Sequence, residues 1–297
     1  MDSDALKNFV VRAEDLPTLP EVALLVMRKI QDPDSSAQDI VNIIERDSSM
    51  TARVLNVANS AFYGMSRRVD SLKMAVVVLG LHQCASIVMG ISVFRGFATQ
   101  LPSSKNFYYD LWRHLMSTAH VAGLLSERFR LEDPAMVYTG GLLHDIGKIV
   151  YCIKAPEKYH RVLQYCREES RSLAEMEQRE FHITHYALGG NLAAQWDFAP
   201  SIVNVLNNHH SLNGELESIT EVATISLADC FCRQENLGDG GNYENADFFT
   251  DNAWAPIFTR GWGKNLSERK EIYSFLFEQK QRISEMTEEF LEICTSG

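Results

Sequence analysis

Apolar residues recur through the first third of the chain at intervals of three and four positions, the spacing that places them on one face of an α-helix. This pattern predicts five helices between residues 14 and 97. Ser36, with Asp39 three residues later, forms a capping-box pattern that opens one helix, and Gly80 separates two long apolar segments. The β-branched run at 76–78 could form a strand instead, but no second strand offers itself as a partner. The N-terminal part is therefore predicted to be all-helical.

The helical period continues beyond a polar connector at residues 98–107 that contains proline and serine. The last predicted helix is interpreted as docked on the chain rather than as a coiled-coil seam, because no heptad pattern persists for three repeats. The helices predicted in this part are 108–130, 133–153, 155–169, 172–181, 183–195, 200–210, 219–235 and 267–293, and a short amphipathic piece at 1–13 precedes them all.

This pattern predicts an all-α fold of two packed helical units, the second a helical bundle with a metal site. The predicted division is an N-terminal part at 14–107, a metal-binding part at 108–236 and a C-terminal extension at 237–297. The glycine-rich loop at 238–242 within the extension carries no functional signal that can be interpreted from the sequence.

Composition narrows the range of partners. The net charge of −11 argues against a nucleic-acid-binding surface, which needs positive charge for phosphates, but it allows a small phosphorylated ligand. No run of about 20 apolar residues predicts a membrane span. The six cysteines show no zinc-binding spacing and are interpreted as reduced core thiols. The sequence predicts a cytoplasmic protein whose partner is a signalling protein or a small phosphorylated ligand, with the oligomeric state left open.

The histidines gather in the second part of the chain. His144 and Asp145 lie side by side in an apolar run, where an isolated pair would most simply be a buried polar plug. Eight of the nine histidines, however, fall between residues 114 and 210, and the candidates occupy different predicted helices. A helical bundle builds a two-metal centre from one or two nitrogen or oxygen ligands on each of several helices. The candidate ligands are His114, His144, Asp145, His185, His209, His210 and Asp229.

These residues resemble the metal-dependent HD phosphohydrolase superfamily, and most closely its HDOD branch, which is related to the HD-GYP cyclic-dinucleotide phosphodiesterases. The resemblance covers about residues 14–236. Its N-terminal motifs are Leu16-Pro-Thr-Leu-Pro-Glu-Val-Ala23, Asp47-Ser-Ser-Met-Thr-Ala-Arg-Val-Leu55, Ala58-Asn-Ser-Ala-Phe-Tyr-Gly64 and the run from Val69 to Gly80.

The resemblance implies roles for these residues. All seven would be metal ligands, with Asp145 as the catalytic bridge between two ions. Lys148 matches the lysine of the family's His-Asp-x-Gly-Lys run and would face the phosphate or the bridging solvent as a second catalytic residue. The cofactor would be two divalent transition-metal ions, iron or manganese first, with nickel or zinc as alternatives.

The other histidines are given simpler roles. His182 lies three residues before His185 and would contact the metal ligands without binding the metal itself, with ligation as the less favoured alternative. His120 is interpreted as a core histidine, and His82 and His160 as structural or exposed.

Three functions stay open. The first is a metal-dependent phosphohydrolase acting on a nucleotide or another phosphoester. The second is a non-catalytic signalling module with a structural or vestigial metal site, and the third, a minor possibility, is a di-iron oxygenase. His210 is followed by Ser-Leu-Asn-Gly-Glu rather than by the Gly-Tyr-Pro segment of HD-GYP enzymes. The sequence therefore predicts a metal site without predicting cleavage of cyclic di-GMP.

Overall fold

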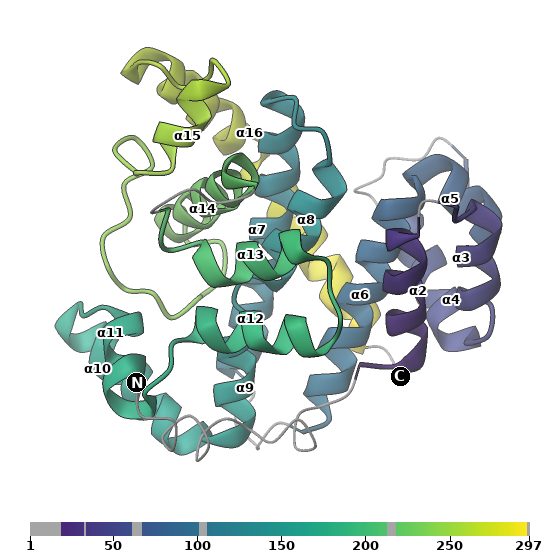
Figure 1. The fold of residues 1–297 in the computed structure, drawn as a ribbon, viewed down its shortest axis with the longest axis horizontal. Coiled ribbons are helices and arrows are strands. Elements are labelled where there is room, and N and C mark those ends of the chain that lie inside the picture. Colours follow the sequence, from purple (N-terminus) through teal and green to yellow (C-terminus); the bar gives the residue numbers. More distant parts are fainter. Residues whose placement is uncertain (1–18, 33, 61–66, 101–105, 213–217, 296–297) are drawn as a thin grey trace. The chain divides into compact units, whose positions relative to one another are not determined.

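The regular elements of the structure are all α-helices (Figure 1). This holds for the residues that the computed structural model describes, which are 19–32, 34–60, 67–100, 106–212 and 218–295. The all-α prediction is confirmed, and the run at 76–78 is helical. The amphipathic piece predicted at 1–13 lies outside the described residues.

The backbone groups into two compact units. The first unit combines Pro17–Gln100 with Gln281–Gly297, and the second contains Leu101–Lys280. The predicted domain boundaries at 107 and 236 stay predictions, because compact grouping does not test independent folding. Among the described residues no single helix has the length and apolar composition to cross a bilayer. Two helices of the first unit pass that test only as a pair bent by 115°.

The first unit contains the five helices that the apolar period predicts. Ser36 forms the predicted capping box, since its side chain accepts from the Asp39 backbone and its own backbone N–H donates to the Asp39 carboxylate. Gly80 has a φ of 86° and separates the last two helices. The helices are α2 (Glu21–Gln31), α3 (Ala37–Ile44), α4 (Ser48–Ala58), α5 (Leu72–Leu79) and α6 (Leu81–Ala98).

The second unit is a bundle in which α14 packs on α7, α8 and α13, while α12 packs on both α9 and α13. Its core is formed by apolar side chains such as Trp112, Leu142 and Phe231. The helices of this unit are α7 (Asn106–Arg128), α8 (Pro134–Leu143), α9 (Ile146–Lys154), α10 (Pro156–Glu169), α11 (Leu173–Phe181), α12 (His185–Gln195), α13 (Pro200–Asn208), α14 (Ile219–Gln234) and α15 (Trp254–Thr259).

The last helix, α16 (Leu266–Thr295), contributes to both units, because the division falls within it. Ile272 and Leu276 are buried in its first half, and Ile283, Met286 and Phe290 are buried in its second half. The apolar face predicted for this helix is therefore covered within the chain, which agrees with a docked helix rather than with a free coiled-coil seam.

One helix prediction for the second unit was wrong, and one short helix was missed. The single helix predicted at 133–153 is broken into α8 and α9, with His144 and Asp145 in the turn between them. Helical periodicity does not reveal this break, because Asp145 leaves the helical conformation (φ −103°, ψ 15°) while apolar residues continue on both sides of it. The short helix α15 was not predicted, because its six residues span less than two turns and carry no extended period.

Candidate metal centre

The structure brings all seven predicted ligands to one place in the second unit. His114 comes from the middle of α7, and His144 with Asp145 comes from the turn between α8 and α9. His185 is the first residue of α12, His209 and His210 follow the end of α13, and Asp229 lies in α14. Six of the seven side chains are buried, and His210 alone is exposed.

The close approach of α9 to the start of α12 sets Asp145 against His185. A Cβ atom on Gly147 would lie 2.0 Å from the carbonyl oxygen of His185, so only glycine permits this contact. Thr184 caps α12 by accepting a hydrogen bond from the Ala187 backbone, which fixes where the helix begins. The packing of α9 on α12 thus places Asp145, which immediately precedes α9, beside His185.

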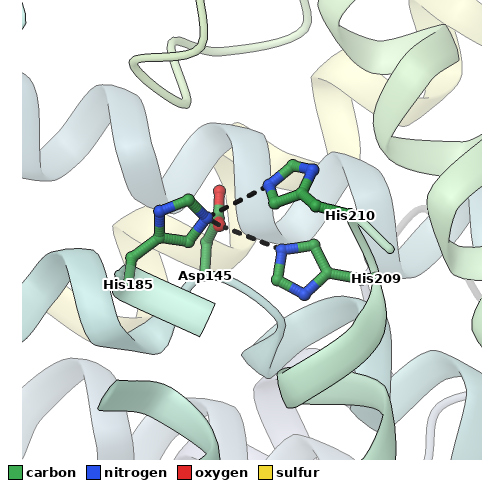
Figure 2. A group of neighbouring side chains, drawn as sticks. All are labelled: Asp145, His185, His209 and His210. Atoms are coloured by element: carbon green, nitrogen blue, oxygen red, sulfur yellow. Dashed lines mark hydrogen bonds and ion pairs between the residues drawn. The ribbon is translucent and has the colours of Figure 1, made fainter. Parts of the chain in front are cut away.

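Asp145 divides the cluster between its two carboxylate oxygens. Oδ2 lies 3.3 Å from Nε2 of His144 and 3.8 Å from Nε2 of His114. Oδ1 lies 3.3 Å from Nε2 of His185 and 3.6 Å from Nε2 of His209, and Figure 2 shows these rings directed toward the carboxylate. A carboxylate with one oxygen on each side is suited to bridging two cations.

The remaining ligands complete two groups, which we name the inner half and the outer half. The inner half consists of His114, His144 and Asp229, with Asp229 Oδ1 3.0 Å from His114 Nε2. The outer half consists of His185, His209 and His210, with the Nε2 atoms of His185 and His210 3.1 Å apart. Within the inner half, and within the outer half together with Asp145, the candidate ligand atoms all lie within 4.8 Å of one another.

Several of these buried atoms have no hydrogen-bond partner among the described residues, which is costly unless a cation satisfies them. The Nδ1 atoms of His144 and His209 face the carbonyl oxygens of Gly141 and Leu206 at 2.7 and 3.1 Å. A carbonyl only accepts, so each Nδ1 carries a proton, and in the neutral form of each ring Nε2 presents a lone pair. The unsatisfied atoms are both ring nitrogens of His114, Nε2 of His144 and His209, Oδ1 of Asp145 and Oδ1 of Asp229. The donor set therefore fits divalent transition metals.

Electrostatics prepares Asp145, His185 and His209 for a cation but works against His144. Burial disfavours the charged form of Asp145, but the Lys148 ammonium, together with the His144 and His209 rings, outweighs burial and holds the pKa of the carboxyl well below its usual range. Burial lowers the pKa values of His185 and His209. Burial also opposes protonation of His144, yet the Asp145 and Asp229 carboxylates together prevail and raise its pKa, so this ring must release its proton before it binds a cation. Ionised carboxylates and neutral imidazoles are the ligand states that metals require.

Lys148 is fully buried and already has two partners. Its Nζ donates to Asp145 Oδ2 and to the carbonyl oxygen of Gly240, both at 2.6 Å. The lysine therefore holds the bridging carboxylate in place, and its contact with a phosphate stays a prediction.

Glu177 is a supporting residue that the sequence analysis missed. Its Oε2 accepts from the backbone N–H of His185 at 2.7 Å and faces Nδ1 of the same ring at 2.6 Å, while Oε1 accepts from Tyr159 at 2.9 Å. Burial raises the pKa of Glu177 to about 8, and a positive charge beyond His185 would favour its ionised form. A signal was present, because Glu177 lies midway between the buried Leu173 and Phe181 on one apolar helix face.

The other histidines lie outside both halves of the centre. His182 ends α11 in a left-handed conformation and is exposed, and His82 and His160 are exposed as well. His120 is buried, with Nδ1 2.7 Å from the Met116 carbonyl oxygen and Nε2 3.4 Å from the Tyr138 hydroxyl. The interpretation of His120 as a core histidine is confirmed.

Burial lowers the pKa of His120 to about 4, and this predicts a pH dependence of stability. The unfolded chain binds the proton with a pKa of about 6.5. The free energy of unfolding should therefore fall as the pH drops from about 6.5 to 4, by about 3 kcal/mol in total from this group, and level off below. Urea denaturation of the metal-free protein and of His120→Gln should show the variant losing less stability over this range. Parallel pH profiles would contradict the assignment.

The fold and this cluster place the chain among all-helical proteins that carry a buried centre of histidine and aspartate side chains. The HDOD domain profile matches residues 16–212, about two thirds of the chain. The chain belongs to the HDOD family. Asp229 lies beyond the matched region, so its place in the centre comes from the structure.

Solved structures agree with this assignment. An HDOD domain protein of unknown function from Geobacter sulfurreducens is 26% identical, with a TM-score of 0.84 and 97% of each chain covered. A candidate phosphohydrolase from Shewanella amazonensis SB2B is 19% identical, with a TM-score of 0.72 over 97% of this chain and 98% of that one. A candidate signal transduction protein from Marinobacter aquaeolei VT8 is 22% identical, with a TM-score of 0.80 over 97% of this chain and 65% of that one.

The last two similarities establish the fold alone, since both are below 25% identity. The chain spans less than half the length of the curated relatives that it matches, including 43% of an uncharacterized protein from Treponema pallidum (strain Nichols) at 26% identity.

Proposed function

We propose that this chain is a metal-dependent phosphohydrolase of the HDOD type, acting in signal transduction on a nucleotide or another small phosphoester. The observation that carries the proposal is the placement of the Asp145 carboxylate, whose two oxygens face two separate sets of candidate ligands. Two divalent ions in such a site polarise a phosphoryl oxygen and lower the pKa of water, which supplies a nucleophile at neutral pH. Iron and manganese come first as the ions, with nickel or zinc as alternatives.

The chain's own residues would hold this chemistry in place. Asp145 would bridge the two halves, and Lys148 would keep the carboxylate ionised and oriented. The exposed edge at His210 is the side from which a substrate would approach, because the inner-half ligands are all buried. The proposed partners are accordingly a small phosphorylated ligand and, through the signalling role, another protein.

A non-catalytic signalling module is the second candidate, and the state of Lys148 favours it. Its ammonium is buried and bonded to Asp145 and to the Gly240 carbonyl, so it offers no free charge to a phosphate in this conformation. Such a module would keep a metal centre for stability or partner binding. It would show no phosphoester turnover with any metal.

The test of the proposed function is metal content followed by turnover. Elemental analysis of the purified chain should find about two transition-metal ions per molecule, as a two-metal centre requires. His144→Ala should lose at least the inner-half ion, because it removes an inner-half ligand. Hydrolysis of bis(p-nitrophenyl) phosphate and p-nitrophenyl phosphate with Mn²⁺ should follow the metal content. Folded protein that binds no metal would reject the proposal, and two bound ions without turnover would favour the signalling module.

A further inference from the structure

The segment 238–241, which we name the strap, lies against the inner half of the metal centre. The Gly240 carbonyl oxygen accepts a hydrogen bond from Lys148 Nζ at 2.6 Å. A Cβ atom on Gly240 would lie 2.8 Å from Cδ2 and 2.9 Å from Nε2 of His114, closer than real Cβ atoms come to other atoms. Only a glycine at this position lets the strap backbone touch the ring of a candidate ligand, and the strap therefore covers that ligand.

Contacts outside the metal centre fasten the strap. The Asp239 backbone N–H donates to the Asp110 carbonyl oxygen at 3.1 Å. The Asp239 carboxylate pairs with Arg167 and accepts from the Tyr243 hydroxyl at 3.1 Å. The Arg167 guanidinium also lies 4.8 Å from the centroid of the Tyr243 ring. The strap is thus tied to α7 and α10, and its position does not depend on Lys148 alone.

The outer half has no comparable cover among the described residues. His210 is exposed, and its Nε2 is 3.1 Å from Nε2 of His185. Tyr186, half-buried, contacts this edge with its ring 6.0 Å from that of His210. The two halves therefore share Asp145 but differ in their access to solvent.

We infer that the two metal positions are unequal, and that the strap is the cause. The inner-half ion is sealed beneath the strap and exchanges slowly, because a leaving ion needs water or a competing ligand to replace its donors. The outer-half ion exchanges quickly, and its position is the one that meets a substrate phosphoryl group. This inference rests on the proposed metal centre and assigns the strap glycine Gly240 a positioning role toward His114.

Release of Mn²⁺ from the loaded full-length chain tests the inference without any measurement of turnover. With excess EDTA, the wild-type protein should lose its ions in two phases of equal amplitude. The release is monitored by withdrawing samples over time, separating the protein from the chelate and counting the manganese left on the protein. His210→Ala should abolish or accelerate the fast phase only. Gly240→Ala should accelerate the slow phase by about tenfold or more, because the added methyl group displaces the strap or His114. Gly96→Ala is the matched control, since a Cβ there meets no atom within 4 Å.

Arg167→Ala provides a second variant that does not touch a ligand. Its side chain is 63% exposed, so the protein should fold, and the loosened strap should accelerate the slow phase by about threefold. If circular dichroism shows that Gly240→Ala does not fold, the rate of the slow phase in Arg167→Ala tests the inference instead. Release of both ions in one phase, or a slow phase unchanged in these variants, overturns the inference. Absence of bound Mn²⁺ in the wild-type protein would instead reject the proposed metal centre itself.

Discussion

Replacing Asp145 with alanine should remove both metal ions, whereas replacing a ligand of one half should spare the other ion. The reason is that Asp145 faces both halves, with Oδ2 3.3 Å from His144 Nε2 and Oδ1 3.3 Å from His185 Nε2. Elemental analysis of Asp145→Ala beside His210→Ala would measure this difference. Turnover of a phosphoester should fall at least about 1000-fold in Asp145→Ala, since the ions supply several kcal/mol of transition-state stabilisation. One ion retained by Asp145→Ala would contradict the bridging role.

The control for this variant concerns the buried lysine. Without Asp145, Lys148 keeps a buried charge with the Gly240 carbonyl as its one remaining partner among the described residues, which should cost about 3 to 5 kcal/mol of stability. A double variant, Asp145→Asn with Lys148→Met, removes the charge and should recover most of that loss in urea denaturation. It should still bind no metal in the bridged arrangement. Metal loss in a stably folded double variant separates loss of the site from loss of the fold.

Most of the helices could be predicted because their signals are local. The apolar period, the Ser36 capping box and the break at Gly80 each depend on neighbouring residues, and each appears in the structure. The break between α8 and α9 could not be predicted in this way. Asp145 leaves the helical conformation there with apolar residues on both sides of it, and the contact that holds this region against α12, between Gly147 and the His185 carbonyl, joins segments almost forty residues apart in the sequence.

The candidate ligands could be found because metal-ligand side chains are few and their clustering is visible in the sequence. Their division into two halves was not visible, since it depends on which oxygen of Asp145 each ring approaches. The strap was beyond prediction for a related reason. It acts through the Gly240 carbonyl and through the lack of a Cβ atom, and a backbone group leaves no distinctive residue in the sequence.

Glu177 leads to the second large expected effect. Replacing it with leucine should weaken metal binding in the outer half by about 100-fold, because no acceptor would then hold the proton on His185 Nδ1 and direct Nε2 toward Asp145. Glu177→Gln keeps an acceptor of the same shape and should weaken binding by only about tenfold. Mn²⁺ titration of both variants, counting ions retained per chain, measures the effect. The inner-half ion should be retained in both.

Tyr159→Phe is the matched control for these variants. It removes the hydroxyl that donates to Glu177 Oε1 at 2.9 Å but leaves both contacts between Glu177 and His185. A merely structural role for Glu177 would make all three variants lose stability and metal together. Because the leucine variant leaves the His185 backbone N–H and the Tyr159 hydroxyl unpaired, a loss of about 1 to 3 kcal/mol for each is expected in stability as well. Positioning of His185 is the explanation only if metal binding in the outer half falls progressively from Tyr159→Phe to Glu177→Gln to Glu177→Leu. The inner-half ion should stay bound in all three variants.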